Sequence, residues 1–139
     1  RLFIGLIAGL VGFLGHSLTM LAQEDDSGAT IAKVIEGQFA AFAADDAGLA
    51  YSFASPMIRQ MFVSPENFGR MVRGGYPMIW AAEEVQLRAL RDEGGRRLQR
   101  VFVKDQAGAG HLFDYEMVMI DGAWRINGVF AVPQDQLGV

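Results

Sequence analysis

The sequence of 139 residues contains no cysteine and only two histidines. The absence of cysteine excludes a disulfide-bonded scaffold, a thiolate zinc site and a cysteine nucleophile. Positive charge is also scarce, since 12 basic residues stand against 16 acidic ones and the net charge is -4. A nucleic-acid-binding domain needs clustered basic residues to neutralise phosphates, so we expect no nucleic acid as a partner. The length suits one ordinary domain.

Charged residues are absent from Leu2 to Ala22. A helix of about 21 residues is roughly 31 Å long, close to the thickness of the hydrocarbon core of a bilayer. Arg1 precedes this segment and the acidic run Glu24-Asp25-Asp26 follows it. Because basic flanks stay on the cytoplasmic side of a membrane, residues 1–23 are predicted to form a transmembrane helix with the rest of the chain outside the cytoplasm.

A cleaved signal peptide is the alternative interpretation of this segment. Signal peptides have apolar cores of about 7–15 residues, followed by small residues at the cleavage site. Here the apolar stretch is longer, and a cut after Ala22 would place Met20 where a small residue is needed. We therefore expect a retained, single-pass anchor.

Small residues recur every three to four positions in the predicted anchor, which gathers them on one helix face. Apolar burial does not drive helix association in lipid, so such a face is typical of close packing against another helix. The predicted partner-helix packing residues are Gly5, Ala8, Gly9, Gly12, Gly15 and Thr19. Glycine is frequent in membrane helices in any case, and the stripe does not identify the partner.

A helical pattern follows the predicted anchor. Residues 23–28 are free of apolar side chains, and residues 24–29 are predicted to form a short linker. Apolar residues between Ile31 and Phe42 then have the spacing of one face of an amphipathic helix, with Ser27 or Thr30 as its N-cap. A short helix is predicted over residues 47–54.

Two serine–proline pairs predict further helix starts. Ser55-Pro56 and Ser64-Pro65 each combine a capping serine with a proline at the first helical position. The run Gly74-Gly75-Tyr76-Pro77 is predicted to end the helical part.

The second half of the chain has a strand period. Apolar and polar residues alternate from Val85 to Ala89 and from Leu112 to Ile120, and Asp121-Gly122 is typical of a tight hairpin. Helices followed by antiparallel strands predict an α+β fold, with about three helices packed on one face of a bent four-stranded antiparallel sheet.

The chain resembles a bacterial family catalogued as a domain of unknown function. The resemblance covers about residues 30–130, and its motifs are Val34-Ile35-Glu36-Gly37-Gln38-Phe39, Phe53-Ala54-Ser55-Pro56, Ser64-Pro65-Glu66-Asn67-Phe68 and Trp124-Arg125-Ile126-Asn127-Gly128. That family is similar to the cone-shaped, cystatin-like proteins of the SnoaL and nuclear-transport-factor type. The resemblance implies an α+β cone over residues 30–139, and it implies no activity. With the anchor, it places the domain in the periplasm, attached to a bacterial inner membrane.

Cone-shaped relatives include isomerases, dehydratases and cyclases, which use a carboxylate or a His–Asp pair inside the cone. Asp114 and Glu116 alternate with the apolar residues of their strand, so they are predicted to lie on its outer side. Asp45 and Asp46 are interpreted as turn and cap residues rather than metal ligands. His111 is interpreted as an exposed edge residue. We therefore expect no catalytic residue, no metal and no cofactor.

A candidate ligand or partner surface consists of Arg73, Tyr76, Trp80 and Tyr115. A cation and aromatic rings beside a Gly-Pro turn are suited to the mouth of a cone or to contact with a partner. In the alternative interpretation, Tyr76 packs the corner between helix and sheet and Arg73 pairs with an acid.

The favoured functional hypothesis is a membrane-anchored, non-catalytic accessory subunit. Its striped helix would dock in a larger bacterial integral membrane complex, respiratory or photosynthetic, and its cone would cap that complex on the periplasmic side.

Two alternatives stay open. The first is a periplasmic binder of a small apolar ligand, with a cavity of several hundred Å³. The predicted lining of that cavity is Phe113, Tyr115, Met117, Met119, Trp124 and Phe130. The second is an isomerase- or dehydratase-type enzyme, which requires an ionisable residue with a shifted pKa inside the cavity.

Overall fold

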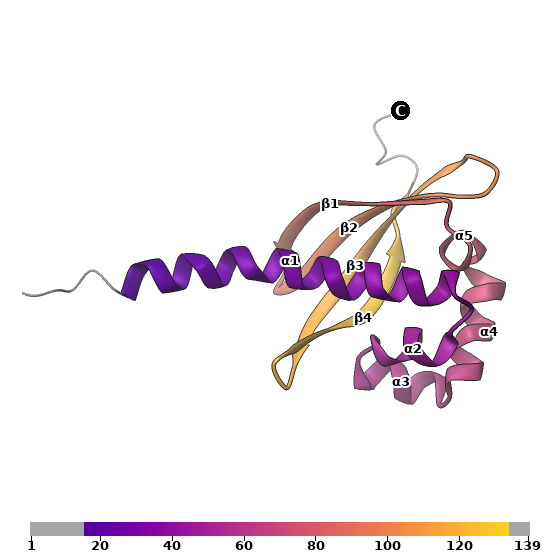
Figure 1. Cartoon of the computed structure of the whole chain (residues 1–139), viewed down its shortest axis with the longest axis horizontal. Helices are drawn as coiled ribbons and strands as arrows, with labels where there is room; N and C mark the ends of the chain where they lie inside the picture. Colours follow the sequence, from indigo (N-terminus) through magenta and orange to yellow (C-terminus); the bar gives the residue numbers. More distant parts are fainter. Residues whose placement is uncertain (1–15, 134–139) are drawn as a thin grey trace, which may run out of the picture.

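The computed structural model describes residues 16–133, with side chains described from Ser27 onward. In this part of the chain, five helices precede four strands (Figure 1). The helices are α1 (His16–Ala43), α2 (Ala47–Ser52), α3 (Pro56–Phe62), α4 (Pro65–Gly75) and α5 (Pro77–Trp80). The strands are β1 (Glu84–Glu93), β2 (Arg96–Lys104), β3 (Gly110–Ile120) and β4 (Ala123–Ala131).

The predicted α+β class and its four-stranded antiparallel sheet are confirmed, but the helix number is wrong. The described part contains five helices rather than about three. The helix that sequence patterns miss is α5, a single turn that begins at Pro77, where the run of glycine and proline predicted only a break. One helical turn is too short for apolar periodicity to reveal it.

The first helix begins much earlier than predicted. Residues 24–29, the predicted linker, are helical, and neither Ser27 nor Thr30 is the N-cap, because α1 begins at His16. The stretch from 16 to 30 contains one glycine and no proline, so nothing in it interrupts the ladder of helical hydrogen bonds.

The predicted anchor lies mostly beyond the described residues. Gly5, Ala8, Gly9, Gly12 and Gly15 are outside them, and Thr19 falls in the part of α1 whose side chains are not described. No helix within residues 16–133 is long and apolar enough to cross a membrane.

Side-chain caps begin three of the helices, as the sequence predicts. The Ser55 hydroxyl accepts a hydrogen bond from the Ile58 N–H at 3.3 Å, which caps α3. The Ser64 hydroxyl accepts from the Asn67 N–H at 3.1 Å and caps α4. Asp46 accepts from the Leu49 N–H at 3.0 Å and caps α2, so its interpretation as a cap residue is confirmed.

The four strands form a meander in the order β1-β2-β3-β4, and Figure 1 shows that the strands bend. The β3–β4 hairpin turns at Asp121 and Gly122, whose φ angles of 50° and 79° are those of the predicted tight turn. The β3–β4 register shifts between Glu116 and Met117, which pair with Gly128 and Ile126. Asn127 is therefore the extra residue of a β-bulge, a feature that bends a strand.

The core lies between α1 and the inner face of the sheet. From α1 it takes Ile31, Ile35, Phe39 and Phe42, the apolar face that the spacing predicts. The sheet contributes Val101, Val103, Phe113, Tyr115, Met117 and Ile126. Helices α2 to α5 gather at one end of the molecule, at the C-terminal end of α1 (Figure 1). The connection between α2 and α3 is tied to β4 by the bridge between Ala54 and Ile126.

An ion-pair network joins three strands. Asp114 on β3 accepts two hydrogen bonds from Arg91 on β1, at 2.8 and 3.0 Å, and two from Arg100 on β2, both at 3.0 Å. Burial raises the pKa of Asp114, but the hydrogen bonds and charges of the two arginines outweigh burial and lower this pKa to about 2. The network therefore stabilises the ionised carboxylate.

Replacing Asp114 by asparagine should make the fold less stable in a pH-dependent way. The pKa of Asp114 in the folded state lies below the unfolded value of about 3.9, so the network stabilises the fold above that value and weakens as pH falls toward 2. We expect Asp114→Asn to lower the free energy of unfolding by about 2 kcal/mol at pH 7 and by far less near pH 2. Denaturant titrations at both pH values measure this difference.

Asp92→Asn is the matched control, because Asp92 also pairs with an arginine but its side chain is 70% exposed. It should change the free energy of unfolding by less than about 0.5 kcal/mol. Equal losses for the two variants, or a loss at Asp114 that does not depend on pH, would contradict the role given to the network.

Candidate functional site

A cavity of about 330 Å³ lies on the inner side of the sheet. Its walls come from α1, α3, α4, α5, the middle of β3 and the bulged part of β4. The lining is mostly apolar and includes Phe42, Ile58, Phe62, Phe68, Met71, Val72, Ile79, Ile126 and Val129. This volume is at the lower end of the range of roughly 300–1,000 Å³ that is typical of pockets for small molecules.

Helix α3 is the outer wall of the cavity. It buries no residue, and four of its side chains line the cavity: Met57, Ile58, Met61 and Phe62. Met57 is 50% exposed and Met61 63% exposed. These residues therefore contact the cavity and the solvent at once, which places the mouth of the cavity beside α3.

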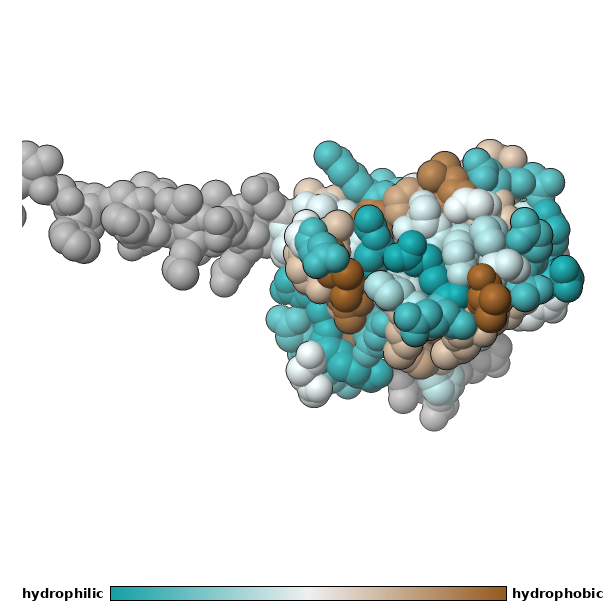
Figure 2. Space-filling model, turned by 90° about the horizontal axis from the view of Figure 1, so that it is seen from below, coloured by the Kyte–Doolittle hydropathy of each residue, from teal (hydrophilic) through white to brown (hydrophobic). Residues whose placement is uncertain are grey.

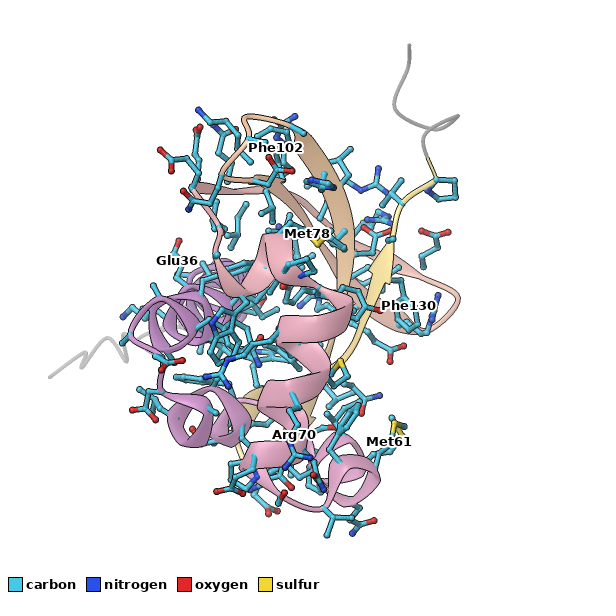
Figure 3. All side chains as sticks on the ribbon, turned by 90° about the vertical axis from the view of Figure 1, so that its right-hand side faces the viewer. Glu36, Met61, Arg70, Met78, Phe102 and Phe130 are labelled. Carbon is cyan, nitrogen blue, oxygen red and sulfur yellow. The ribbon has the colours of Figure 1, made fainter. Side chains whose placement is uncertain are left out.

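The other side of the mouth is formed by β4. Figure 3 shows Phe130 on β4 and Met61 on α3 on the same side of the molecule. Phe130 lines the cavity and is 48% exposed. Its ring packs back over Gly128, where an added Cβ would come within 2.9 Å of the ring. Glycine at 128 therefore allows this aromatic side chain to cover the bulged strand.

Tyr115 lies at the buried end of the cavity. Its side chain is completely buried and lines the cavity, and its ring centroid is 6.0 Å from that of Phe39. The hydroxyl has no hydrogen-bond partner among the described residues. Burial raises the pKa of Tyr115, so the phenol keeps its proton. A buried hydroxyl without a partner costs free energy; among the described residues, Arg59 Nε is the other buried side-chain atom without one.

Two other polar side chains of the lining have partners within the protein. The Gln38 amide donates to the Ala50 carbonyl at 3.1 Å. The Asn127 carbonyl oxygen accepts from the Ser55 hydroxyl at 2.8 Å, and the Asn127 amide donates to Glu116 at 2.9 Å. These contacts hold the bulge of β4 against the start of α3.

The cavity is uncharged. Within residues 27–133, no aspartate, glutamate, histidine, lysine or arginine lines it. The acids of β3 are occupied elsewhere, since Asp114 pairs with arginines of β1 and β2 and Glu116 with Arg96 at 3.4 Å. Tyrosines are the ionisable side chains of this lining, and the arrangement suits binding of a neutral molecule better than acid–base chemistry.

The candidate surface predicted from the sequence divides into two parts. Tyr76 and Tyr115 line the cavity, and Tyr76 also packs edge-on against Phe113. Arg73 and Trp80 do not line it. Arg73 pairs with Asp45, and its guanidinium carbon lies 4.2 Å from the centre of the Trp80 ring. The interpretation that Arg73 pairs with an acid therefore agrees with this geometry.

The predicted lining of the cavity is largely wrong. Tyr115 and Phe130 belong to it, whereas Met117, Met119 and Trp124 line a groove near the hairpin ends, and Phe113 packs in the core. An eleven-residue strand spreads its inward side chains over its whole length, and only the middle of β3 reaches the cavity. The walls that sequence patterns miss are α3 and α4. For α3 the signal is the pair Met57-Ile58 with the pair Met61-Phe62, which together are apolar on more than one helix face.

The remaining candidate residues have structural contacts. His111 is half-buried rather than exposed, and its Nε2 lies 2.8 Å from an oxygen of Asp105. This bond to His111 and the N–H groups of Ala109 and Ala107 lower the pKa of Asp105. No group of three potential metal ligands occurs in the part of the chain that the structure describes.

The model of a family described as a domain of unknown function (DUF4864) matches residues 24–139, and the chain belongs to this family. Membership of a family of unknown function is the part of the resemblance that is thereby confirmed. No curated protein and no solved structure matches the chain.

Removing the Tyr115 hydroxyl should stabilise the protein. Tyr115→Phe keeps the ring in the core and deletes a buried polar group that has no partner among the described residues. The free energy of unfolding should rise by about 1 kcal/mol, within the range of about 1–3 kcal/mol for such a group. Thermal and denaturant unfolding measure the change. A clear loss of stability would show that the hydroxyl is hydrogen-bonded in the free protein.

Proposed function

We propose that this DUF4864 domain is a non-catalytic binding module for a small, mostly apolar molecule. The observation that carries this proposal is the cavity of about 330 Å³, lined mainly by apolar side chains and bordered by exposed ones at its mouth. Burial of apolar ligand surface in such a cavity is favourable. The cavity thus favours the ligand-binding alternative over the capping role expected first.

The exposed rim of the mouth supports the same proposal. Met57, Met61 and Phe130 are each about half exposed or more, although they are large apolar side chains. On the face shown in Figure 2, apolar side chains form separate patches among polar ones rather than one continuous surface. Isolated apolar rims of this kind suit the entrance of a small-molecule site better than a broad protein interface.

The chemistry of the lining favours binding without catalysis. General acid–base catalysis needs a group that gains and loses a proton near the working pH. Tyr115 keeps its proton because burial raises its pKa, and no carboxylate or imidazole lines the cavity within the described residues. This supports a binding role over the isomerase- or dehydratase-type alternative.

The cone-like fold implied by the resemblance is part of the proposal. A long α1 packed on a bent meander, with short helices closing one end, supports a cone of the SnoaL and nuclear-transport-factor type (Figure 1). In such a cone the cavity would be the space between the sheet and the helices, which is where the described cavity lies.

Filling the cavity should abolish binding of an apolar probe. Val72 is 5% exposed, lies on α4 and lines the cavity, so Val72→Phe places a ring in that space. Phenylnaphthylamine, a neutral dye that fluoresces in apolar sites, should bind the wild-type protein and bind Val72→Phe at least tenfold more weakly. Fluorescence titration gives both dissociation constants.

Val118→Phe is the control, because the same exchange on β3 lies outside the cavity lining. It should leave the affinity for the dye unchanged, and circular dichroism should show both variants folded. Equal dye binding by all three proteins would refute the cavity as the binding site.

We also propose the role expected first from the sequence, in which residues 1–23 anchor the domain in a bacterial inner membrane with the domain in the periplasm. The uncharged stretch from Leu2 to Ala22 and its stripe of small residues support this second candidate. In it, the striped helix packs in a larger integral membrane complex and the domain caps that complex. The two proposals are compatible, because the cavity opens beside α3 and β4, and its described lining begins at Gln38, after the predicted anchor.

The anchor can be tested in bacterial membranes. The protein should remain in the membrane fraction after an alkaline carbonate wash, as a spanning helix does. Joint replacement of Gly9 and Gly12 by leucine should remove a stoichiometric partner in detergent without releasing the protein from the membrane. Leu10→Phe, on the opposite face, should retain the partner. Release by carbonate contradicts the anchor, and a wild-type protein that purifies alone contradicts the subunit role.

A further inference from the structure

We infer that the ligand of the cavity is a neutral molecule with a hydrogen-bond acceptor oxygen, such as a ketone, ester or quinone, held by Tyr115 at the closed end. This inference rests on the proposed binding function and assigns the chemical class and orientation of the ligand. The observation behind it is that Tyr115, a completely buried residue whose hydroxyl has no partner among the described residues, belongs to the lining of an apolar cavity.

Tyrosine at position 115 is unfavourable for the free domain. The hydroxyl is removed from water, and no described residue replaces the lost hydrogen bond. Phenylalanine would fill the same place in the core beside Phe39 without that cost. A ligand atom that pairs with the hydroxyl recovers the hydrogen bond, so this residue is better suited to the occupied cavity than to the empty one.

The polarity of the ligand follows from the state of the phenol. Burial raises the pKa of Tyr115, so its O–H is available as a donor. The amides of Gln38 and Asn127, also in the lining, already donate to Ala50 and Glu116. Because a neutral phenol is a stronger hydrogen-bond donor than acceptor, the ligand group that complements it best at the closed end is an acceptor.

The charge of the ligand follows from the lining. No arginine, lysine or histidine within the described residues lines the cavity. A carboxylate or phosphate at the closed end would be buried without a counter-charge, which is costly. The oxygen that Tyr115 binds is therefore that of a neutral group.

The apolar body of the ligand would extend from Tyr115 toward the mouth. The exposed fraction of the lining rises from 0% at Tyr115 to 63% at Met61, which gives the cavity one closed end and one open end. Three methionines, Met57, Met61 and Met71, line the path. Methionine side chains adapt their shape, so the site would accept tails of differing form and be most selective at the oxygen.

Three probes with the same phenyl–alkyl skeleton test the inference: butyrophenone, butylbenzene and phenylbutyrate. Dissociation constants for each are measured by calorimetry at pH 7 on wild-type protein, Tyr115→Phe and Tyr51→Phe. Tyr115→Phe should weaken butyrophenone about three- to tenfold, the value of one hydrogen bond, and leave butylbenzene within about twofold. Because each probe is compared with itself across the variants, the contribution of its hydrophobicity to the dissociation constant cancels.

Tyr51→Phe is the matched control, because it makes the same exchange at a half-buried tyrosine that lies outside the cavity lining. It should leave butyrophenone binding unchanged, and phenylbutyrate should bind wild-type protein more weakly than butyrophenone. Equal effects of Tyr115→Phe on ketone and hydrocarbon, or tighter binding of phenylbutyrate, would overturn the inference while leaving cavity binding intact. If none of the three probes binds, the proposed function itself fails.

Discussion

The packing of α1 across the inner face of the sheet is the contact on which the rest of the structure depends. The apolar face from Ile31 to Phe42 packs on the sheet and contributes six of the sixteen buried residues of the core cluster. It also contacts β4. The bulged part of β4 is contacted by α3 as well, a helix that buries none of its residues and whose start is tied to β4 through Ala54 and Ile126 and through Ser55 and Asn127. A space is therefore left between a well-packed helix and a loosely packed one.

Charge and apolar surface are separated across the same sheet. On one side, Asp114 joins Arg91 and Arg100 in a network that links three strands. On the other side, alternate residues of β3 enter the core. This separation keeps ionised groups out of the cavity and leaves a tyrosine as its buried polar group without a partner in the described structure. The alternation of side chains along β3 thus places Asp114 and Glu116 on one face of the sheet and Tyr115 on the other.

Helix caps and turns, which depend on neighbouring residues, were predictable from the sequence. Features that depend on packing between elements far apart in the sequence were not. Each helix cap is a hydrogen bond that a side chain accepts from the N–H group three residues later, so the local sequence is enough to predict the helix start. The caps are Ser55, Ser64 and Asp46. The turn at Asp121-Gly122 is likewise a local matter. The cavity depends on how far α3 stands from β4, which no short-range pattern encodes. Tyr115 was predicted as a ligand-surface residue, but its unpartnered hydroxyl became apparent only from the packing around it.

The start of α1 is a local feature that the sequence pattern did not predict. The acidic run before Thr30 predicts a linker, because residues 23–28 contain no apolar side chain to bury. Helix propensity prevails there, since the residues are compatible with a helix that is already nucleated by the packed part of α1. Sequence patterns of this kind indicate which face of a helix is buried more reliably than where the helix begins.

The most direct test of the central claim is a methyl NMR titration of methionine-labelled protein with butyrophenone. The account predicts saturable shifts of the Met57, Met61 and Met71 methyl signals, which belong to the cavity walls, while the signal of Met119, near the hairpin end, stays in place. Shifts confined to Met119, or no saturable shift at any of the three wall methionines, would contradict it.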